Sequence, residues 1–376
     1  MTAGIRRRVA RDGSVSWQVR FEVVDHEGRR RESSRTFPTR RDALAFKATR
    51  DRDRLAGADG AYNPLLGRTP LSEVWHHWAV AQERNVKAKT WWNTRSHWRL
   101  RVLPRWGAVA VGDITTSDVD RWAASLSVGA VSAGQSLNLL RRLLDQAVED
   151  GRIRKNPARG VRAPRARQPE RHQYLTIAQV NALAAACGEP GGIGYDVVVT
   201  LALCGLRWSE LVALRVRDVD MAASRIYVRR AAVDVGGHLV VDEPKTRAGR
   251  RAVPLPALVK AVLEGRVTGR ALDELVFTSP RGRMLRATNW RRSVSWNDAK
   301  TKANAELLTL HGLRHTYASL ARRAGADLKT LQRTMGHSTI IVTADTYSDL
   351  YADEVDLVAQ RLDELTQTGQ EPDTTE

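Results

Sequence analysis

The stretch HGLRHTYASLARRAG places two histidines and an arginine on a segment whose Leu and Ala residues predict a buried helix. His311, Arg314 and His315 stand at positions i, i+3 and i+4, so their side chains share one helix face. Polar groups on a buried face are unfavourable unless a partner satisfies them. The pattern therefore predicts that this face lines a cleft that receives an anionic group.

Three further segments bring basic or nucleophilic side chains to breaks between expected helices and strands. Arg207 follows a glycine break in LALCGLRWSELVAL, and Lys245 lies at a strand end beside a turn in EPKTRAGRRAVP. His337 follows a glycine at a helix–helix turn in MGHSTIIVTADTY, and Tyr347 comes ten residues later. Binding and catalytic residues are often held at such connections, so these four residues are candidates for a common site.

The net charge indicates what kind of partner this site receives. The 376 residues carry a formal charge of +18, whereas residues 351–376 reverse the sign with eight acidic residues and one base, Arg361. A basic body with an acidic tail favours a polyanion such as nucleic acid over a merely solvated basic surface.

The candidate residues match what a protein needs to join itself to a DNA phosphate without a metal. Arg207 and Arg314 suit the non-bridging oxygens, because a guanidinium holds phosphate bidentately. Tyr347 suits in-line attack, since its phosphotyrosine ester conserves the bond energy for religation. Lys245 suits the departing 5′ oxygen as general acid, because a lysine ammonium loses its proton readily in a desolvated cationic site. The phosphate would neutralise Arg314 and bridge it to Arg207.

Taken in sequence order, from Arg207 to Tyr347, the segments resemble the tyrosine recombinase (phage integrase) family, whose pattern is Arg, a hairpin Lys, His-x-x-Arg, His or Trp, and Tyr. GLRWSEL, LRHT, MGHS and DTY are similar to the family's motifs, and the resemblance covers nearly all of residues 174–365. It implies that His311 assists proton transfer at Tyr347, that His337 hydrogen-bonds a phosphate oxygen and that Glu210 orients the site.

Some neighbouring residues admit a second interpretation. Tyr351 is a rival nucleophile, although the DTY context favours Tyr347. His315 is interpreted as structural and Tyr317 as a core residue. His311 and His315 have the spacing of a zinc pair, but neither a third ligand nor a glutamate base accompanies them, so neither a metal nor a cofactor is expected.

Two local features qualify the resemblance. Gly312 stands where the family commonly has Asp after the histidine, which leaves the catalytic set untouched. Arg247, Arg250 and Arg251, near Lys245, either hold the DNA backbone or merely solvate the hairpin, and backbone contact is favoured.

The segment 174–365 must position these residues. It is expected to be a mainly helical catalytic domain with a small antiparallel sheet, the DNA breaking-rejoining fold. Thr176 and Gln179 form a capping box that opens its first helix. The stretch SRIYVRRAAVDVGGHLVVDEPKTRAGRRAVPLP predicts three antiparallel strands with turns at 236–237 and 246–249. A disordered tail, 366–376, is expected to follow.

The residues before 174 predict two further domains. In residues 1–60, SWQVRFEVVD alternates as a strand does, and a turn, the partner strand RRESSRTF and a helix after Pro38 follow, which predicts a small α+β module of three strands and one helix. Residues 65–165 have helical periodicity, with tryptophans in the core. Residues 154–173 carry three prolines and many arginines and predict an exposed basic linker.

The resemblance assigns functions to these domains. Residues 1–60 look like the arm-type DNA-binding module of integrases, and residues 65–165 look like a core-DNA-binding domain. The family implies site-specific strand exchange on double-stranded DNA through a 3′-phosphotyrosine, integrating or excising a phage or other mobile element. It also implies a homo-tetramer in which residues 350–365 dock on a neighbouring protomer; the alternative is that this apolar stripe folds back in cis. Accessory DNA-bending or excision factors are further candidate partners.

Two other functions fit parts of the pattern. A type IB topoisomerase shares the chemistry but relaxes supercoils without a partner site. A DNA-binding regulator that has lost catalysis should lack one of Arg207, Arg314 or Tyr347, and the chain retains all three. Without an apolar run of about 18 residues or a signal peptide, the protein is expected in the bacterial cytoplasm, nucleoid-associated when bound, with Cys187 and Cys204 as buried hydrophobic residues.

Overall fold

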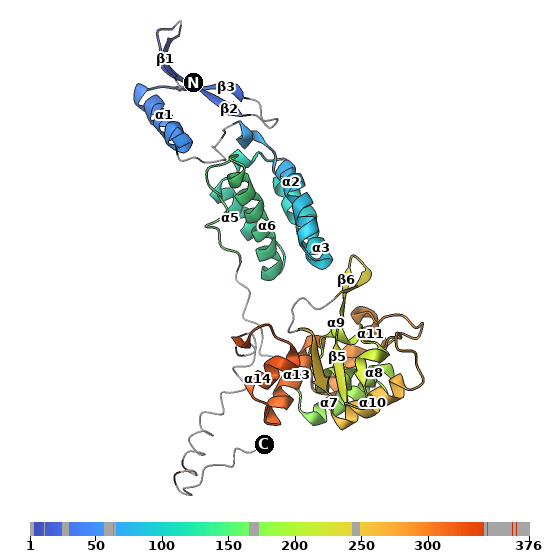
Figure 1. Cartoon of the computed structure of the whole chain (residues 1–376). Helices are drawn as coiled ribbons and strands as arrows, with labels where there is room; N and C mark the ends of the chain where they lie inside the picture. The colour runs from blue at the N-terminus through green and yellow to red at the C-terminus, as the bar shows by residue number, and fades with distance from the viewer. Residues whose placement is uncertain are drawn as a thin grey trace. The chain divides into compact units, whose positions relative to one another are not determined.

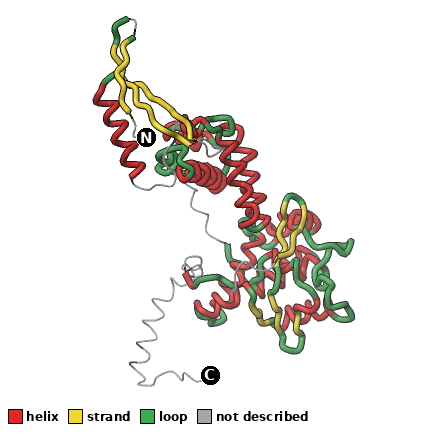
Figure 2. The backbone as a smooth tube through the Cα atoms, turned by 45° about the horizontal axis from the view of Figure 1, so that its top comes forward, coloured by secondary structure: helices red, strands yellow, loops and turns green. Residues whose placement is uncertain are grey.

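The structure is a computed structural model that describes residues 4–10, 12–24, 30–55, 63, 65–164, 173–242, 249–341, 344, 363 and 366. The chain divides into two compact units, Met1–Gln168 and Pro169–Glu376 (Figure 1). Helices dominate, and the strands form small antiparallel sheets, as Figure 2 shows by colour. These elements agree with the predicted combination of a small α+β module, an all-helical segment and a mainly helical segment with a little sheet.

The amino-terminal module is a three-stranded antiparallel sheet with one helix. Its elements are β1 (Gly4–Val9), β2 (Val15–Val24), β3 (Arg30–Phe37) and α1 (Arg40–Leu55), with the strands in sequence order. Val19 and Phe21 of β2 pack against Ala43 of α1, because alternate strand residues face the helix. The predicted strand at 16–25 and the helix after Pro38 are confirmed. The predicted turn at 26–30 lies almost wholly outside the described residues.

Residues 65–164 are helical, with a core rich in tryptophan. The elements are η1 (Leu66–Arg68), α2 (Leu71–Asn85), α3 (Ala88–His97), the π-helical η2 (Trp98–Val102), α4 (Leu103–Trp106), η3 (Val111–Asp113), α5 (Thr116–Ser125) and α6 (Ala130–Glu149). Trp75 stacks on Trp98 with ring centroids 4.6 Å apart and on Trp91 at 5.7 Å. The tryptophans are therefore core residues as predicted, with the exception of Trp92, which is 42% exposed.

The start of the predicted linker is not exposed. Residues 154–164 form neither helix nor strand, but Asn156, Ala158 and Val161 are buried. Arg141 of α6 donates hydrogen bonds to the carbonyls of Ala158 and Val161. The expectation that this arginine-rich segment is exposed is wrong here, because three of its side chains pack under α6.

The second unit is built from helices around one buried helix. The described helices are α7 (Ile177–Cys187), α8 (Ile193–Cys204), α9 (Trp208–Leu211), η4 (Val216–Asp218), α10 (Ala257–Val267), α11 (Ala287–Ser293), α12 (Trp296–Lys302), α13 (Leu310–Arg323) and α14 (Leu328–Met335). Thr176 and Gln179 form the predicted capping box of α7. Apart from residues 363 and 366, the tail and the helix expected at 350–365 lie outside the described residues.

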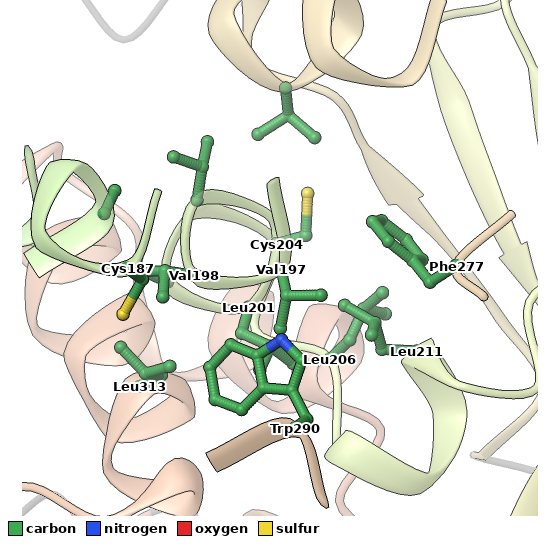
Figure 3. Packing of buried hydrophobic residues seen from close by; sticks show 14 of the residues in the cluster. Cys187, Val197, Val198, Leu201, Cys204, Leu206, Leu211, Phe277, Trp290 and Leu313 are labelled. Atoms are coloured by element: carbon green, nitrogen blue, oxygen red, sulfur yellow. The ribbon is translucent and has the colours of Figure 1, made fainter. Parts of the chain in front are cut away.

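Helix α8 is apolar on nearly every side because other elements surround it. Figure 3 shows Val197, Val198 and Leu201 of α8 close to Leu313 of α13 and Trp290 of α11. A helix that is apolar all round is a buried helix. The core therefore fixes the end of α8, after which Arg207 follows, relative to α13, which carries Arg314.

Two cysteines belong to this core. Cys187 and Cys204 are buried free thiols, and burial raises the pKa of each to about 12. Their interpretation as buried hydrophobic residues is confirmed. Among the described helices, none has the length and apolar character needed to cross a membrane.

The strands of the second unit form two sheets. β4 (Val219–Asp220), β5 (Arg225–Val228) and β8 (Arg251–Pro254) make one sheet, while β6 (Ala231–Val235) and β7 (His238–Asp242) make a separate hairpin. The prediction of one three-stranded sheet is wrong because β5 pairs with the distant β8, with Ile226 opposite Val253, and not with the adjacent β6. The turn at 236–237 is present, and that at 246–249 lies, except for Gly249, outside the described residues.

Candidate active site

Arg207 occupies the tight connection between α8 and α9. Gly205 ends α8 with φ of 62°, in the left-handed region, and a Cβ there would overlap the Tyr317 ring. Arg207 then donates its backbone N–H to Glu210 Oε2 at 2.9 Å and its Nη1 to Oε1 at 2.7 Å. Its Nη2 donates to the carbonyl of Gly336 at 3.3 Å. The guanidinium is thereby held in place while its side chain stays 35% exposed.

Arg314 lies deeper, on α13. It is 1% exposed and donates Nη1 to the carbonyl of Gly205 at 2.6 Å and Nη2 to that of Met335. Two backbone carbonyls therefore already accept hydrogen bonds from this side chain, while neutralisation of its charge by a bound phosphate stays a prediction. The same contacts fasten the turn before Arg207 to the end of α14.

The two histidines of α13 differ in exposure. His311 is exposed, whereas His315 is 8% exposed, and their rings meet edge to face with centroids 4.9 Å apart. Burial of His315 agrees with its interpretation as a structural residue, and His311 faces outward on the same helix. Tyr317 is half-buried beneath Gly205, and burial raises the pKa of its phenol.

Glu210 is the acidic centre of the arginine cluster. It is 5% exposed and pairs with Arg251 of β8, Oε1 lying 3.1 Å from Nη1 and Oε2 2.9 Å from Nη2. Burial alone would raise the pKa of this carboxyl, but the hydrogen bonds and charge of Arg251, with the charge of Arg207, outweigh burial and lower it to about 2. Glu210 therefore stays ionised, in keeping with a side chain that orients arginines.

The burial of Arg251 was not predicted from the sequence. Its side chain is 5% exposed and pairs with Glu210, so it does not simply solvate the hairpin. One signal was present: Arg251 and the fully buried Val253 are two apart in one strand and so face the same side. Arg250, by contrast, is exposed, and Arg247 lies outside the described residues.

The end of α14 is where the three arginines converge. Arg251 Nε donates to the carbonyl of Thr334, Arg314 to that of Met335 and Arg207 to that of Gly336. The last carbonyls of a helix lack partners within the helix and carry partial negative charge. Three guanidinium groups therefore cap three consecutive carbonyls, and His337 is the next residue.

His337 is held in a cationic, partly dry environment. Gly336 caps α14 in the left-handed conformation with φ of 66° and turns the chain so that His337 leaves the helix. Burial lowers the pKa of its imidazole to about 4, and four positive neighbours add to this effect: Arg314, Arg207, Arg251 and His311. His337 is consequently neutral near pH 7 and has one N–H to donate.

Basic clefts border this cluster. One cleft of about 490 Å³ contains His337 and Arg251, and its other cationic lining residues are Arg225, Arg250, Lys329 and Arg333. A second, of about 830 Å³, shares Arg250 and Arg251 and adds three arginines: Arg215, Arg229 and Arg230. Cationic clefts of this kind suit a polyanionic backbone.

Of the predicted site residues, the structure brings Arg207, Glu210, Arg314 and His337 together, with His311 nearby. Lys245, Tyr347 and Tyr351 lie outside the described residues. Within the described part of the chain, no group of three His, Cys, Asp or Glu side chains could hold a metal ion.

Comparison with known proteins gives the family. The model of the phage integrase family matches residues 173–354. The integrase of Mycobacterium phage FRAT1 is 30% identical over 305 residues, which cover 78% of this chain and 88% of the relative. The putative prophage phiRv2 integrase of Mycobacterium tuberculosis is 29% identical over 346 residues, or 88% of each chain.

Solved structures share the fold. The Tn1549 transposon integrase in complex with transposon right end DNA has a TM-score of 0.65 at 24% identity over 77% of this chain and all of that chain. A lambda integrase tetramer bound to a Holliday junction has a TM-score of 0.57 at 17% identity over 98% and 97%. The predicted fold class is thus confirmed, and the chain belongs to the phage integrase family as a tyrosine-type site-specific recombinase.

Proposed function

We propose that the chain cuts and rejoins double-stranded DNA through a covalent 3′-phosphotyrosine and thereby integrates or excises a phage or other mobile element. The observation that carries the proposal is the convergence of Arg207, Arg314 and Arg251 on the turn that presents His337. This cluster places fixed positive charge beside a neutral hydrogen-bond donor, which is how a pentacoordinate phosphorus with its extra charge is stabilised.

Each side chain then has a part in the reaction. Arg207, the partly exposed arginine, contacts the non-bridging oxygens, and Arg314 adds its charge from beneath. His337 donates its N–H to the same oxygens. Glu210 holds Arg207 in orientation.

The Tyr347 oxygen attacks phosphorus as its phenolic proton passes to a base, a part that the family pattern assigns to His311. The P–O5′ bond breaks, and the departing 5′ oxygen takes a proton from Lys245. Attack by a 5′ hydroxyl of the partner strand reverses these steps and releases Tyr347. The parts given to Lys245 and Tyr347 depend on the sequence motifs alone.

The remaining domains extend the contact with DNA. We assign residues 1–60 to arm-type sites and 65–165 to core-type sites, with residues 174–365 carrying the chemistry and the segment 154–173 joining the two. Synapsis is assigned to a homo-tetramer, supported by the likeness to the lambda integrase tetramer. Residues 350–365 would dock on a neighbouring protomer, so deletion of 352–376 should abolish cooperative DNA binding. Cooperative DNA binding that survives the deletion would contradict this assignment. Accessory bending or excision factors and a location in the bacterial cytoplasm complete the proposal.

The proposed reaction is tested by strand exchange between two sites. Duplexes selected by the full-length chain from a random-sequence pool would be cloned as a pair into one supercoiled plasmid, and products would be followed with EDTA present. Inversion or deletion that requires both sites supports recombination. Relaxation of a plasmid that lacks the sites, with no exchange, would support a type IB topoisomerase instead.

A further inference from the structure

We infer that Arg251 is a positioning residue of the recombination site: it ties the carbonyl end of α14, and with it His337, to the carboxylate that also orients Arg207. This inference deepens the proposed function and depends on it for the reaction that is positioned. It adds a residue of β8 to a described set otherwise drawn from α9 and the connection before it, from α13 and from the turn after α14.

The contacts of Arg251 account for all three of its guanidinium nitrogens. Nη1 and Nη2 grip Glu210 at 3.1 Å and 2.9 Å, and Nε donates to the carbonyl of Thr334 at 2.5 Å. Nη1 also lies 3.4 Å from the carbonyl of Gly249. An arginine that is 5% exposed and bound on both edges is oriented as firmly as a side chain can be.

The orientation of Arg251 is transmitted to Arg207 through one shared atom. Oε1 of Glu210 accepts from Nη1 of Arg207 at 2.7 Å and from Nη1 of Arg251 at 3.1 Å. Movement of Arg251 therefore turns the carboxylate and displaces Arg207. The bond to Thr334 acts at the same time on α14, two residues before the carbonyl of Gly336 that Arg207 itself contacts.

A simpler account would give Arg251 only the task of neutralising a buried carboxylate. Lysine separates the two accounts, because it supplies the charge but lacks the planar fork that binds a carboxylate and a carbonyl together. The chain also offers a matched control. Arg266 pairs with the fully buried Asp196 at 2.6 Å, with a side chain 17% exposed, and neither residue contacts the arginine cluster.

The experiment compares the full-length chain with Arg251→Lys and with the matched control Arg266→Lys. Thermal unfolding, DNA affinity and the single-turnover rate of covalent cleavage of a nicked duplex would be measured for each. We expect Arg251→Lys to bind DNA within about twofold of wild type but to cleave roughly 10- to 100-fold more slowly, as a displacement near 1 Å produces. Arg266→Lys should lose stability but keep its cleavage rate.

A second readout needs no DNA. The groups around the His337 imidazole are Arg207 ahead of α9, Arg314 and His311 of α13, and Arg251 of β8. Removal of one positive charge in Arg251→Gln should raise the His337 pKa measured by NMR, whereas Arg266→Gln should leave it unchanged. Cleavage by Arg251→Lys at the wild-type rate, or an unmoved His337 titration in Arg251→Gln, would overturn the inference. Failure of the proposed function is distinguishable, because it would leave the wild type itself without a covalent adduct.

Discussion

Arg207 and Arg314 donate hydrogen bonds to successive backbone carbonyls, those of Gly336 and Met335. The two arginines lie 107 residues apart in the chain, yet they grip the same turn from different depths, Arg207 at 35% side-chain exposure and Arg314 at 1% residue exposure. Arg207 is thus available to a ligand, whereas Arg314 holds the turn from the buried side.

This difference in depth predicts different results for the two substitutions. Arg314→Met leaves two buried carbonyls without donors, each of which costs about 1–3 kcal/mol, so the free energy of unfolding should fall by about 2–5 kcal/mol. Arg207→Met should lower it less, since Arg251 still pairs with Glu210. Urea denaturation checks both values, and equal losses would contradict the assigned depths. Both variants should lose covalent cleavage.

The break after α8 predicts a backbone requirement. Gly205→Ala must adopt φ near 62° and place its Cβ against the Tyr317 ring, so it should be less stable by about 1–3 kcal/mol. The double variant Gly205→Ala/Tyr317→Ala should recover only the part of this stability loss that comes from steric overlap, because the unfavourable φ remains. A double-mutant cycle measures that part. A neutral Gly205→Ala would show that the connection before Arg207 is not constrained as described.

Two groups should make the free energy of unfolding fall as the pH is lowered: His337 and Glu210. The His337 pKa, lowered to about 4, lies below its unfolded value of about 6.5. The unfolded chain therefore takes up a proton first as pH falls, and stability declines between these values. Glu210, lowered to about 2, contributes stability that is present above about pH 4.5 and lost toward pH 2. His337→Gln should flatten the profile between pH 6.5 and 4 in denaturation measured across pH, and an unchanged profile would contradict the assignment.

The stability lost when a tryptophan of the helical segment is replaced should depend on how deeply that tryptophan is buried. Trp98 stacks on Trp75 and is 6% exposed, so its replacement by Ala should lower the free energy of unfolding by about 3–5 kcal/mol. Trp92, which is 42% exposed, should change stability by about 0.5 kcal/mol or less. Chemical denaturation of both variants provides the check, each serving as the control for the other.

Local patterns in the sequence were sufficient for much of this architecture. The Thr176–Gln179 pair marked the start of α7, and the alternation in residues 16–25 marked strand β2; the structure confirms both elements. Such features depend on residues a few positions apart, so periodicity and capping rules apply to them directly.

Features that depend on distant residues were not predicted. The pairing of β5 with β8 joins strands separated by the whole β6–β7 hairpin, and neither strand alone specifies its partner. The burial of Arg251 follows from that pairing, because β8 turns its side chain toward Glu210. The two carbonyl partners of Arg314 belong to other elements, so its spacing on α13 gave no sign that the fold itself supplies these two acceptors.

The most direct test of covalent catalysis is to find the atom that carries DNA. A nicked duplex that loses the departing strand would trap the adduct with EDTA present, and peptide mass mapping would locate the nucleotide. We expect the nucleotide on Tyr347, an adduct absent from Tyr347→Phe and an adduct retained by Tyr351→Phe. A nucleotide on Tyr351, or an adduct that persists in Tyr347→Phe, would contradict the assignment of the nucleophile, and a wild-type chain without an adduct would contradict the mechanism itself.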